Sequence, residues 1–321
     1  IGWHYGFSAA GIGMALGLLQ FYFTRYRLED AGLKMQSSIQ ENDKKNILNY
    51  LIIFSIILIS FSTLSLSGYI KIDPIALANV MTIIIVAIAF LYFAYIYVFG
   101  GLNLNEKKRI GLIIVLFIGA AFFWSGFDQA GSSFNIFAKD YTDRIILGWE
   151  YPASWLQILN PVLVVILSPF MAYLWIFLGK KMMNPNLPFK FGLGLIFMAI
   201  GFVVIAIGAE IALSEGLASA KWLLLTYLFH TIGELALSPV GLSAISSLSP
   251  KRYVGQMMGI WFLASSLGAI IAGLISGRAT IEGIETMPTL FNQIAFISTI
   301  IGVILLVISK PLSNWALKEN K

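Results

Sequence analysis

Long apolar stretches alternate with short polar segments along almost the whole chain. Windows of roughly 20 residues or more with few or no charged side chains lie at 3–23, 47–70, 75–100, 110–134, 156–179, 191–213, 222–248, 254–276 and 289–309. About 20 apolar residues in a helix cross the hydrocarbon core of a bilayer, and the windows lack the alternation typical of membrane-barrel strands. Because hydrocarbon offers the backbone no hydrogen-bond partner, these windows must form helices. We therefore predict an all-α membrane protein with nine transmembrane helices.

The composition agrees with a membrane protein. Of 321 residues, 58% are hydrophobic and 12% are charged, whereas soluble domains carry about 25% charged residues. This excludes a cytosolic enzyme, a disordered chain and a nucleic-acid binder, so we expect the lipid bilayer and no nucleic acid among the partners. The chain contains no cysteine and two histidines, which excludes thiol nucleophiles and thiolate metal sites and leaves little for a zinc site. We expect no metal and no cofactor.

The basic residues predict which side of the membrane each polar segment faces. Of the 21 Lys and Arg residues, all lie in segments that follow odd-numbered windows, except Lys71, Lys139, Arg144, Lys221 and Arg278. Cytoplasmic segments carry an excess of Lys and Arg, so we predict a multi-pass protein of the cell (inner) membrane with a cytoplasmic C-terminus. Nine helices then place the N-terminus outside. Because the chain begins without a methionine or a basic flank, we expect the C-terminal part of a longer protein; a mature protein with a cleaved leader is the alternative.

The windows and the segments between them suggest an organisation in parts. Residues 1–23 form one helix, and the polar segment 24–46 reads as a cytoplasmic linker. The two helices of 47–100 have no charge in their interior and form a lipid-facing hairpin without a catalytic role. The six helices of 110–309 contain the deep carboxylates, and 310–321 is a cytoplasmic tail. Function is therefore expected in 110–309.

The first candidate functional residue is Asp128, deep in the fourth window. A carboxylate in hydrocarbon is costly, so it must face a water-filled cavity, pair with a cation or hold a proton. Burial raises the pKa of a carboxyl group and a nearby cation lowers it, so a group that alternates between such environments loads and releases a proton. In a continuous α-helix, Trp124, Asp128 and Ser132 would share one face. We predict proton coupling at Asp128, with a structural ion pair as the alternative.

The second candidate is Glu234 in the seventh window. Ser238 lies one turn further along, and the next residue, Pro239, lacks an N–H, which frees the carbonyl of Leu235 and kinks the helix. A negative charge beside a kink and a free carbonyl suits a primary ammonium group. His230, one turn earlier, is able to hydrogen-bond the carboxylate, but a lone histidine in a helix is more often a packing residue, and its role stays open.

Other polar and aromatic side chains at membrane depth are weaker candidates for binding. They are Asn160, Trp261, Phe262 and Ser265. Aromatic residues in a membrane span are usually packing or interface residues. The charged segment 135–154 forms either a gate at the mouth of a cavity or a solvated hairpin.

Four stretches of the sequence resemble the proton-dependent oligopeptide transporter family, a branch of the major facilitator superfamily. In chain order they are FWSGFDQAGSSFNIFA, WLQILNPVLVVILSP, GELALSPVGLSAISSLSP and GIWFLASSLGAIIAG. The opening stretch GWHYGFSAAGIGMALGL is similar to the sixth helix of the family, and 47–100 is similar to the two-helix insert of its bacterial members. The resemblance implies a C-terminal six-helix bundle of a major facilitator fold, plus one helix of the N-terminal bundle and the insert.

The resemblance also implies roles for individual residues. Glu234 corresponds to the acid that receives the ammonium group of a peptide, with Ser238 beside it, and Asp128 to an acidic position linked to proton coupling. Asn160 would bond to the peptide backbone. The side-chain pockets would be lined by Trp124, Trp261, Phe262 and Ser265. Ala269 departs from the family, in which many members have asparagine there, so a polar role at that position is in doubt.

The function implied by the resemblance is proton-coupled symport of di- and tripeptides by alternating access, with protons as the coupling ion and no enzymatic reaction. The first five helices of the family have no counterpart in this chain, so we expect the missing N-terminal helical bundle as a partner. One alternative is a related secondary transporter for another small solute. Another is a non-transporting membrane subunit of a larger proton-translocating assembly, although such modules need lysines in mid-helix. An intramembrane hydrolase would need a serine with a positioned base, and neither histidine has that relationship to a serine.

Overall fold

The computed structural model describes residues 3–28, 41–69, 71 and 73–317. The chain divides into two compact units, Ile1–Ile72 and Asp73–Lys321, and each has its own structure. Within the described ranges, nine helices are long and apolar enough to cross a membrane. The predicted set of spans is therefore confirmed, and the chain is a multi-pass membrane protein.

The first unit consists of two apolar helices, α1 (Trp3–Thr24) and α2 (Glu41–Leu66). A 3-10 turn, η1 (Arg25–Leu28), follows α1. Almost all described side chains of this unit are exposed. Because so much contiguous apolar surface is unfavourable in water, these helices need lipid or other helices around them.

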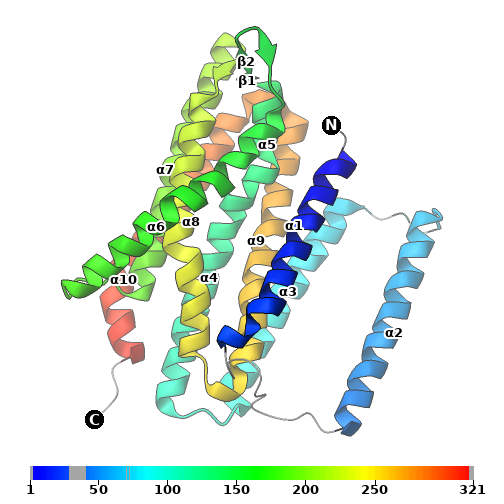
Figure 1. Ribbon diagram of the computed structural model, residues 1–321, viewed down its shortest axis with the longest axis vertical. Coiled ribbons are helices and arrows are strands. Elements are labelled where there is room, and N and C mark those ends of the chain that lie inside the picture. The colour runs from blue at the N-terminus through cyan, green and yellow to red at the C-terminus, as the bar shows by residue number, and fades with distance from the viewer. Residues whose placement is uncertain (1–2, 29–40, 70, 72, 318–321) are drawn as a thin grey trace. The chain divides into compact units, whose positions relative to one another are not determined.

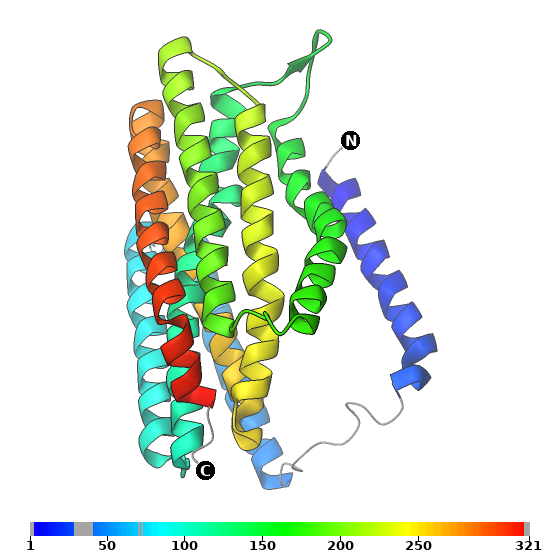
Figure 2. The same ribbon diagram turned by 90° about the vertical axis from the view of Figure 1, so that its left-hand side faces the viewer.

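The second unit is a bundle of the remaining helices (Figure 1, Figure 2). Its α-helices are α3 (Pro74–Phe99), α4 (Leu104–Phe127), α5 (Ser133–Asp140), α6 (Leu159–Lys180), α7 (Leu187–Glu215), α8 (Lys221–Leu248), α9 (Val254–Glu282) and α10 (Met287–Leu317), and its 3-10 turns are η2 (Asp128–Gly131), η3 (Ala153–Ile158), η4 (Lys251–Tyr253) and η5 (Gly283–Glu285). Helix α7 packs against α8 and α10, α4 against α9 and α10, and α6 against α8. Both views place the α8–α9 connection and the end of α10 at one end of the bundle, and the α5–α6 loop at the other.

Polar side chains begin α3 and α4 by capping their first turns. The Asp73 carboxylate accepts a hydrogen bond from the backbone N–H of Ile75 at 2.9 Å. Asn103 and Glu106 form a reciprocal capping box, with hydrogen bonds of 2.8 and 2.9 Å. A cap replaces the missing intrahelical partner of a first-turn N–H and contributes about 1 kcal/mol. The ends of both helices therefore follow from local sequence.

Glycines allow α7 to approach two neighbours closely. A Cβ atom on Gly233 of α8 would lie 2.7 Å from the carbonyl oxygen of Gly194 in α7, and one on Gly192 would lie 2.8 Å from the carbonyl oxygen of Gly302 in α10. A larger side chain at either point would force the backbones apart. Because Gly233 directly precedes Glu234, the α7–α8 contact sets the position of that acid.

A cluster of aromatic rings joins three helices that are distant in the sequence. Phe134 of α5, Phe202 of α7 and Phe291 of α10 are fully buried, with ring centroids 5.5 to 6.2 Å apart. Such pairs contribute about 0.5–1.5 kcal/mol beyond the burial of their area. The cluster holds α5 against the bundle, just after η2.

The segment between α5 and α6 is a short hairpin. Strand β2 (Ile145–Ile146) pairs antiparallel with β3 (Trp149–Glu150), while β1 (Thr142–Asp143) pairs in parallel with β4 (Ala218–Ser219) from the α7–α8 connection. The guanidinium group of Arg144 donates to the carbonyl oxygens of Tyr151 and Lys139, at 2.6 and 3.2 Å, and to the carboxylate of Glu150. Arg144 thus bonds within its own segment, which favours the hairpin over a gate.

Helix α3 is attached to the bundle by one of its faces. The Tyr92 hydroxyl donates to Gln256 Oε1 of α9 at 2.8 Å, and the Arg252 guanidinium donates to the carbonyl oxygen of Gly101 at 2.7 Å. The sequence predicted one lipid-facing hairpin over 47–100, but α2 and α3 fall in different compact units. The predicted domain boundaries stay a prediction, whereas α3 has both a buried and an exposed face.

Candidate functional site

Glu234 and Asn160 lie in contact although 74 residues separate them in the chain. Glu234 is near the middle of the 28-residue helix α8, about 20 Å from either end. Asn160 is in the first turn of α6, and its Nδ2 donates to Glu234 Oε2 at 2.9 Å. The other oxygen, Oε1, receives no hydrogen bond from any described residue. The sequence predicted both residues as binding residues but did not predict their contact.

Thr231 completes this contact and was not predicted. Asn160 Nδ2 also donates to Thr231 Oγ1 at 3.1 Å, and the Thr231 hydroxyl donates to the carbonyl oxygen of Tyr227 at 2.7 Å. Thr231 lies three residues before Glu234, so both share a face of α8. That spacing is the signal that could have found it. The amide of Asn160 is thereby oriented, and Glu234 Oε1 remains available to an outside donor.

A cavity of about 180 Å³ adjoins Asn160. Its walls come from α4 with η2, from η3 with α6, and from α8, and they are Phe127, Ala130, Gly131, Gln157, Asn160, Pro161, Tyr227 and His230. Whole ligand pockets measure roughly 300–1,000 Å³. The cavity is therefore smaller than a whole ligand pocket, and it adjoins Glu234 only through Asn160, because Glu234 itself does not line it.

Asp128 lies where α4 gives way to η2. The sequence predicted Trp124, Asp128 and Ser132 on one helix face. The backbone N–H of Asp128 still donates to the carbonyl oxygen of Trp124, one turn back. For Ser132 the prediction is wrong, because α4 ends at Phe127 and Ser132 adopts non-helical angles of φ −127° and ψ −96°. The Ser132 hydroxyl instead donates to the backbone carbonyl oxygen of Asp128 at 3.3 Å. A helix break places the acid beside irregular backbone, which membrane proteins tolerate only where it is buried in protein or lines a water-filled cavity.

The Asp128 carboxylate is half-buried. Among the described residues it makes no ion pair, since the ion pairs found there are Arg144–Glu150 and Arg252–Glu106. An ionisable group at membrane depth without a cation faces water, a ligand or another part of the protein. No ion pair with another described residue of this bundle therefore supports the alternative of a structural ion pair.

Gln129 was not predicted and is the most tightly bonded polar residue near the break. It is fully buried, and its Nε2 donates to the carbonyl oxygen of Ala272 in α9 at 3.2 Å. Its Oε1 accepts a hydrogen bond from the Ser133 hydroxyl at 2.6 Å. Gln129 thus ties η2 to α9 and α5. An uncharged polar residue beside an intramembrane acid was the available signal.

The predicted binding residues of α9 lie in different surroundings. Trp261 is 4% exposed and packs against Phe191 of α7, with ring centroids 6.1 Å apart, and against Gly241 of α8. Phe262 is 59% exposed, and Ser265 is half-buried. The cavity described above is lined by none of the three predicted residues. Their role in side-chain pockets stays a prediction.

Trp124 and Ser238 lie closer to the cavity and to the acid. The Trp124 ring packs edge-on against Phe127, a cavity wall, with centroids 5.3 Å apart. Its indole Nε1 is buried without a hydrogen-bond partner among the described residues, so a donor is available there. Ser238 is half-buried, one turn beyond Glu234. Neither position contradicts the predicted role, and neither tests it.

His230 is a packing residue that also forms part of the cavity wall. It is 1% exposed, and its ring packs against Phe134 and Phe202, with centroids 5.4 and 4.9 Å apart. In the described ranges no group of three or more His, Asp or Glu side chains is placed to hold a metal ion.

Comparison with known proteins identifies relatives of this chain. The model of the POT family matches residues 1–287. The peptide transporter YePEPT of Yersinia enterocolitica is 36% identical over 319 residues, which are 97% of this chain and 62% of that protein. A di-/tripeptide transporter of Lactococcus lactis subsp. cremoris is 30% identical, over 97% of this chain and 63% of its own length. The chain spans less than two thirds of these relatives.

Solved structures show the same fold. A peptide transporter POT in complex with sulfate matches with a TM-score of 0.81 at 29% identity, over 97% of this chain and 62% of that one. A POT structure in complex with alafosfalin matches with a TM-score of 0.78 at 30% identity, over 98% and 62% of the two chains. The predicted major facilitator fold is confirmed.

Proposed function

We propose that this chain, which belongs to the POT family as its motifs predicted, is the C-terminal part of a transporter that carries di- and tripeptides across the membrane together with protons. The proposal includes no cofactor; the proton is the coupling ion. The observation that carries it is Glu234, a half-buried acid in mid-span. One of its oxygens accepts a hydrogen bond from Asn160, and the other receives none from a described residue.

Glu234 would bind the N-terminal ammonium group of the peptide. A charge-assisted hydrogen bond from an ammonium to a carboxylate is about twice as strong as a neutral one. Asn160 already donates to Oε2, so the ammonium would approach Oε1. The adjoining cavity would take part of the peptide, and the missing N-terminal bundle would supply the remaining walls.

Asp128 would carry the proton. Its position at the α4 break leaves it without an ion pair among the described residues, so a cation on the missing bundle is the expected partner in the unprotonated state. Protonation would break that pair and let the two bundles rearrange about the site. One proton moving through about 100 mV releases about 2.3 kcal/mol, enough for about 40-fold accumulation of a substrate.

The expected location is the cell (inner) membrane, with the C-terminus in the cytoplasm. The support is the excess of Lys and Arg in segments that follow odd-numbered spans. A reporter that is active only in the cytoplasm should be active when it is fused after Lys321. An inactive reporter would show that the C-terminus lies on the opposite side of the membrane.

The test of the function is dipeptide uptake into liposomes that contain the full-length product of the gene. Asp128→Asn should abolish uphill uptake driven by a pH gradient and leave exchange of peptide across the membrane measurable. Glu234→Gln should abolish both, because it removes the ammonium site.

Two exposed acids of the same bundle provide matched controls. Asp140→Asn and Glu210→Gln make the same chemical changes at exposed positions and should leave uptake and exchange intact. If Asp128→Asn still concentrates dipeptide under a proton gradient, the coupling assignment is wrong. If the unmodified protein exchanges no dipeptide, the substrate assignment is wrong.

A further inference from the structure

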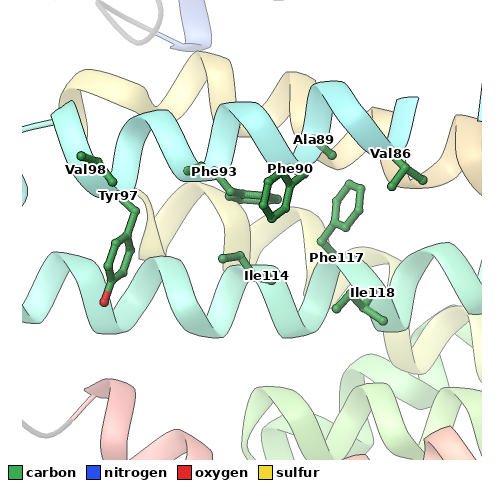
Figure 3. Close-up of a pocket in the computed structure, with 10 residues that line it drawn as sticks. Val86, Ala89, Phe90, Phe93, Tyr97, Val98, Ile114, Phe117 and Ile118 are labelled. Carbon is green, nitrogen blue, oxygen red and sulfur yellow. The ribbon is translucent and has the colours of Figure 1, made fainter. Parts of the chain in front are cut away.

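An apolar groove lies between α3 and α4 (Figure 3). It shares no lining residue with the cavity beside Asn160. Its volume is about 520 Å³, within the roughly 300–1,000 Å³ of ligand sites. Val86, Phe90 and Tyr97 line it from α3, and Ile114 and Ile118 line it from α4. The hydroxyl of Tyr97 is the one side-chain oxygen among the lining residues.

The groove is open along its length. Phe90, Tyr97 and Ile118 are 70%, 46% and 48% exposed, so no other described residue of the unit Asp73–Lys321 covers them. These side chains belong to helices long and apolar enough to cross the membrane. A concave apolar surface at membrane depth offers more contact to a hydrocarbon chain than a flat helix face does.

One end of the groove carries a positive charge. Lys107 precedes Ile114 by seven residues, so the two lie on the same stripe of α4, about 10 Å apart along its axis. The Lys107 ammonium lies over the ring of Tyr97, 5.1 Å from its centroid. Lys108 follows directly. The positive charge therefore lies at the end of the groove where α3 ends and α4 begins.

The nearby acid does not neutralise these lysines. Glu106 accepts a hydrogen bond from the backbone of Asn103 at 2.9 Å and lies 3.8 Å from the guanidinium of Arg252. In the described part of the chain, neither Lys107 nor Lys108 pairs with a carboxylate. Their charge is available to an anion at the membrane surface.

We propose that this groove binds one phospholipid with an anionic headgroup, its acyl chain along the groove and its phosphate beside Lys107 and Lys108. Basic sites between transmembrane helices bind anionic headgroups, and the apolar walls extend directly from such a site. A zwitterionic lipid would fill the groove equally well but would gain less from the two lysines. The lipid would bridge α3 and α4 and so support the attachment of α3 to the bundle.

The test is lipid binding to the full-length product of the gene, measured by native mass spectrometry in mild detergent. Phosphatidylglycerol and phosphatidylcholine with the same acyl chains are titrated separately. We expect one molecule of phosphatidylglycerol to bind to the protein with high affinity. Lys107→Gln should weaken the affinity for phosphatidylglycerol about fivefold, and the double variant Lys107→Gln with Lys108→Gln about 25-fold. The affinity for phosphatidylcholine should be unchanged.

A second pair of lysines provides the matched control. Lys180 is the last residue of α6, and Lys181 follows it as the C-cap. The Lys181 ammonium also lies over an aromatic ring, that of Phe177, at 4.4 Å, but neither lysine borders the groove. Lys180→Gln with Lys181→Gln should leave the phosphatidylglycerol affinity unchanged. An equal loss in this variant would show non-specific attraction and overturn the proposal.

Filling the groove tests the acyl-chain site independently of charge. Ala94 lines the groove and is exposed, so Ala94→Trp occupies the space without crowding the core. It should weaken the binding of phosphatidylglycerol and of phosphatidylcholine alike, by at least about fivefold, and leave the melting temperature unchanged. Unchanged lipid affinity, equal binding of both lipids to the unmodified protein, or no bound lipid because another helix fills the groove would each overturn the proposal.

Discussion

The most direct prediction concerns the charge of Glu234 and the ammonium group of a peptide. Glu234→Gln keeps the shape of the side chain, and its amide oxygen still accepts the hydrogen bond from Asn160, which is 2.9 Å long in the structure. What changes is the other position, where the oxygen Oε1 is replaced by an NH2 group that donates hydrogen bonds and accepts none. The substitution therefore removes both the negative charge and the acceptor that would face the ammonium, while the shape of the side chain is kept.

The expected magnitude follows from that one contact. A hydrogen bond to a charged group contributes about 1.5–3 kcal/mol, which corresponds to about 10- to 150-fold in affinity. Dialanine should bind the unmodified protein more tightly than N-acetyl-dialanine by this factor, because acetylation removes the ammonium. In Glu234→Gln, the two ligands should bind within about twofold of each other, since the coupling between the two groups is lost.

Isothermal titration calorimetry of the full-length protein with both ligands measures all four affinities. Equal melting temperatures for the two proteins would show that Glu234→Gln leaves the fold intact. The reasoning is refuted if Glu234→Gln still prefers dialanine over its acetylated form by tenfold or more, because the ammonium would then bind elsewhere.

Two further predictions concern packing around the site. Gly233→Ala should lower the melting temperature and weaken the binding of dialanine, because its Cβ would lie 2.7 Å from the carbonyl oxygen of Gly194 and overpacking costs about 1–3 kcal/mol. The control is Gly255→Ala, which has open space around it. Equal melting temperatures for the two variants would contradict the close contact. Gln129→Leu should lower the melting temperature by several degrees. It removes the hydrogen bond to the carbonyl oxygen of Ala272, and leaving a buried polar group without its partner costs about 1–3 kcal/mol. A melting temperature equal to that of the unmodified protein would show that this hydrogen bond is not stabilising.

Much of the architecture was readable from the chain because a bilayer imposes a local rule. Each span must satisfy its own backbone and be about 20 apolar residues long, so the nine windows match the helices without knowledge of their neighbours. Asp128 and Glu234 could also be identified from the local sequence, since a carboxylate at membrane depth is energetically costly and is usually functional. Family motifs around Asp128 and Glu234 then identified the kind of protein.

Contacts between distant residues were decided only by the tertiary structure. Asn160 reaches Glu234 across 74 positions, and nothing in either local stretch encodes that distance. The break of α4 at Asp128 was missed because an apolar helix pattern continues through it, while Gln129 bonds to another helix and holds the turn. Trp261 has the same local pattern whether it faces a ligand or the core, and packing against Phe191 placed it in the core. Hydrophobicity sets which segments enter the membrane, but the faces they turn to one another depend on which side chains fit together.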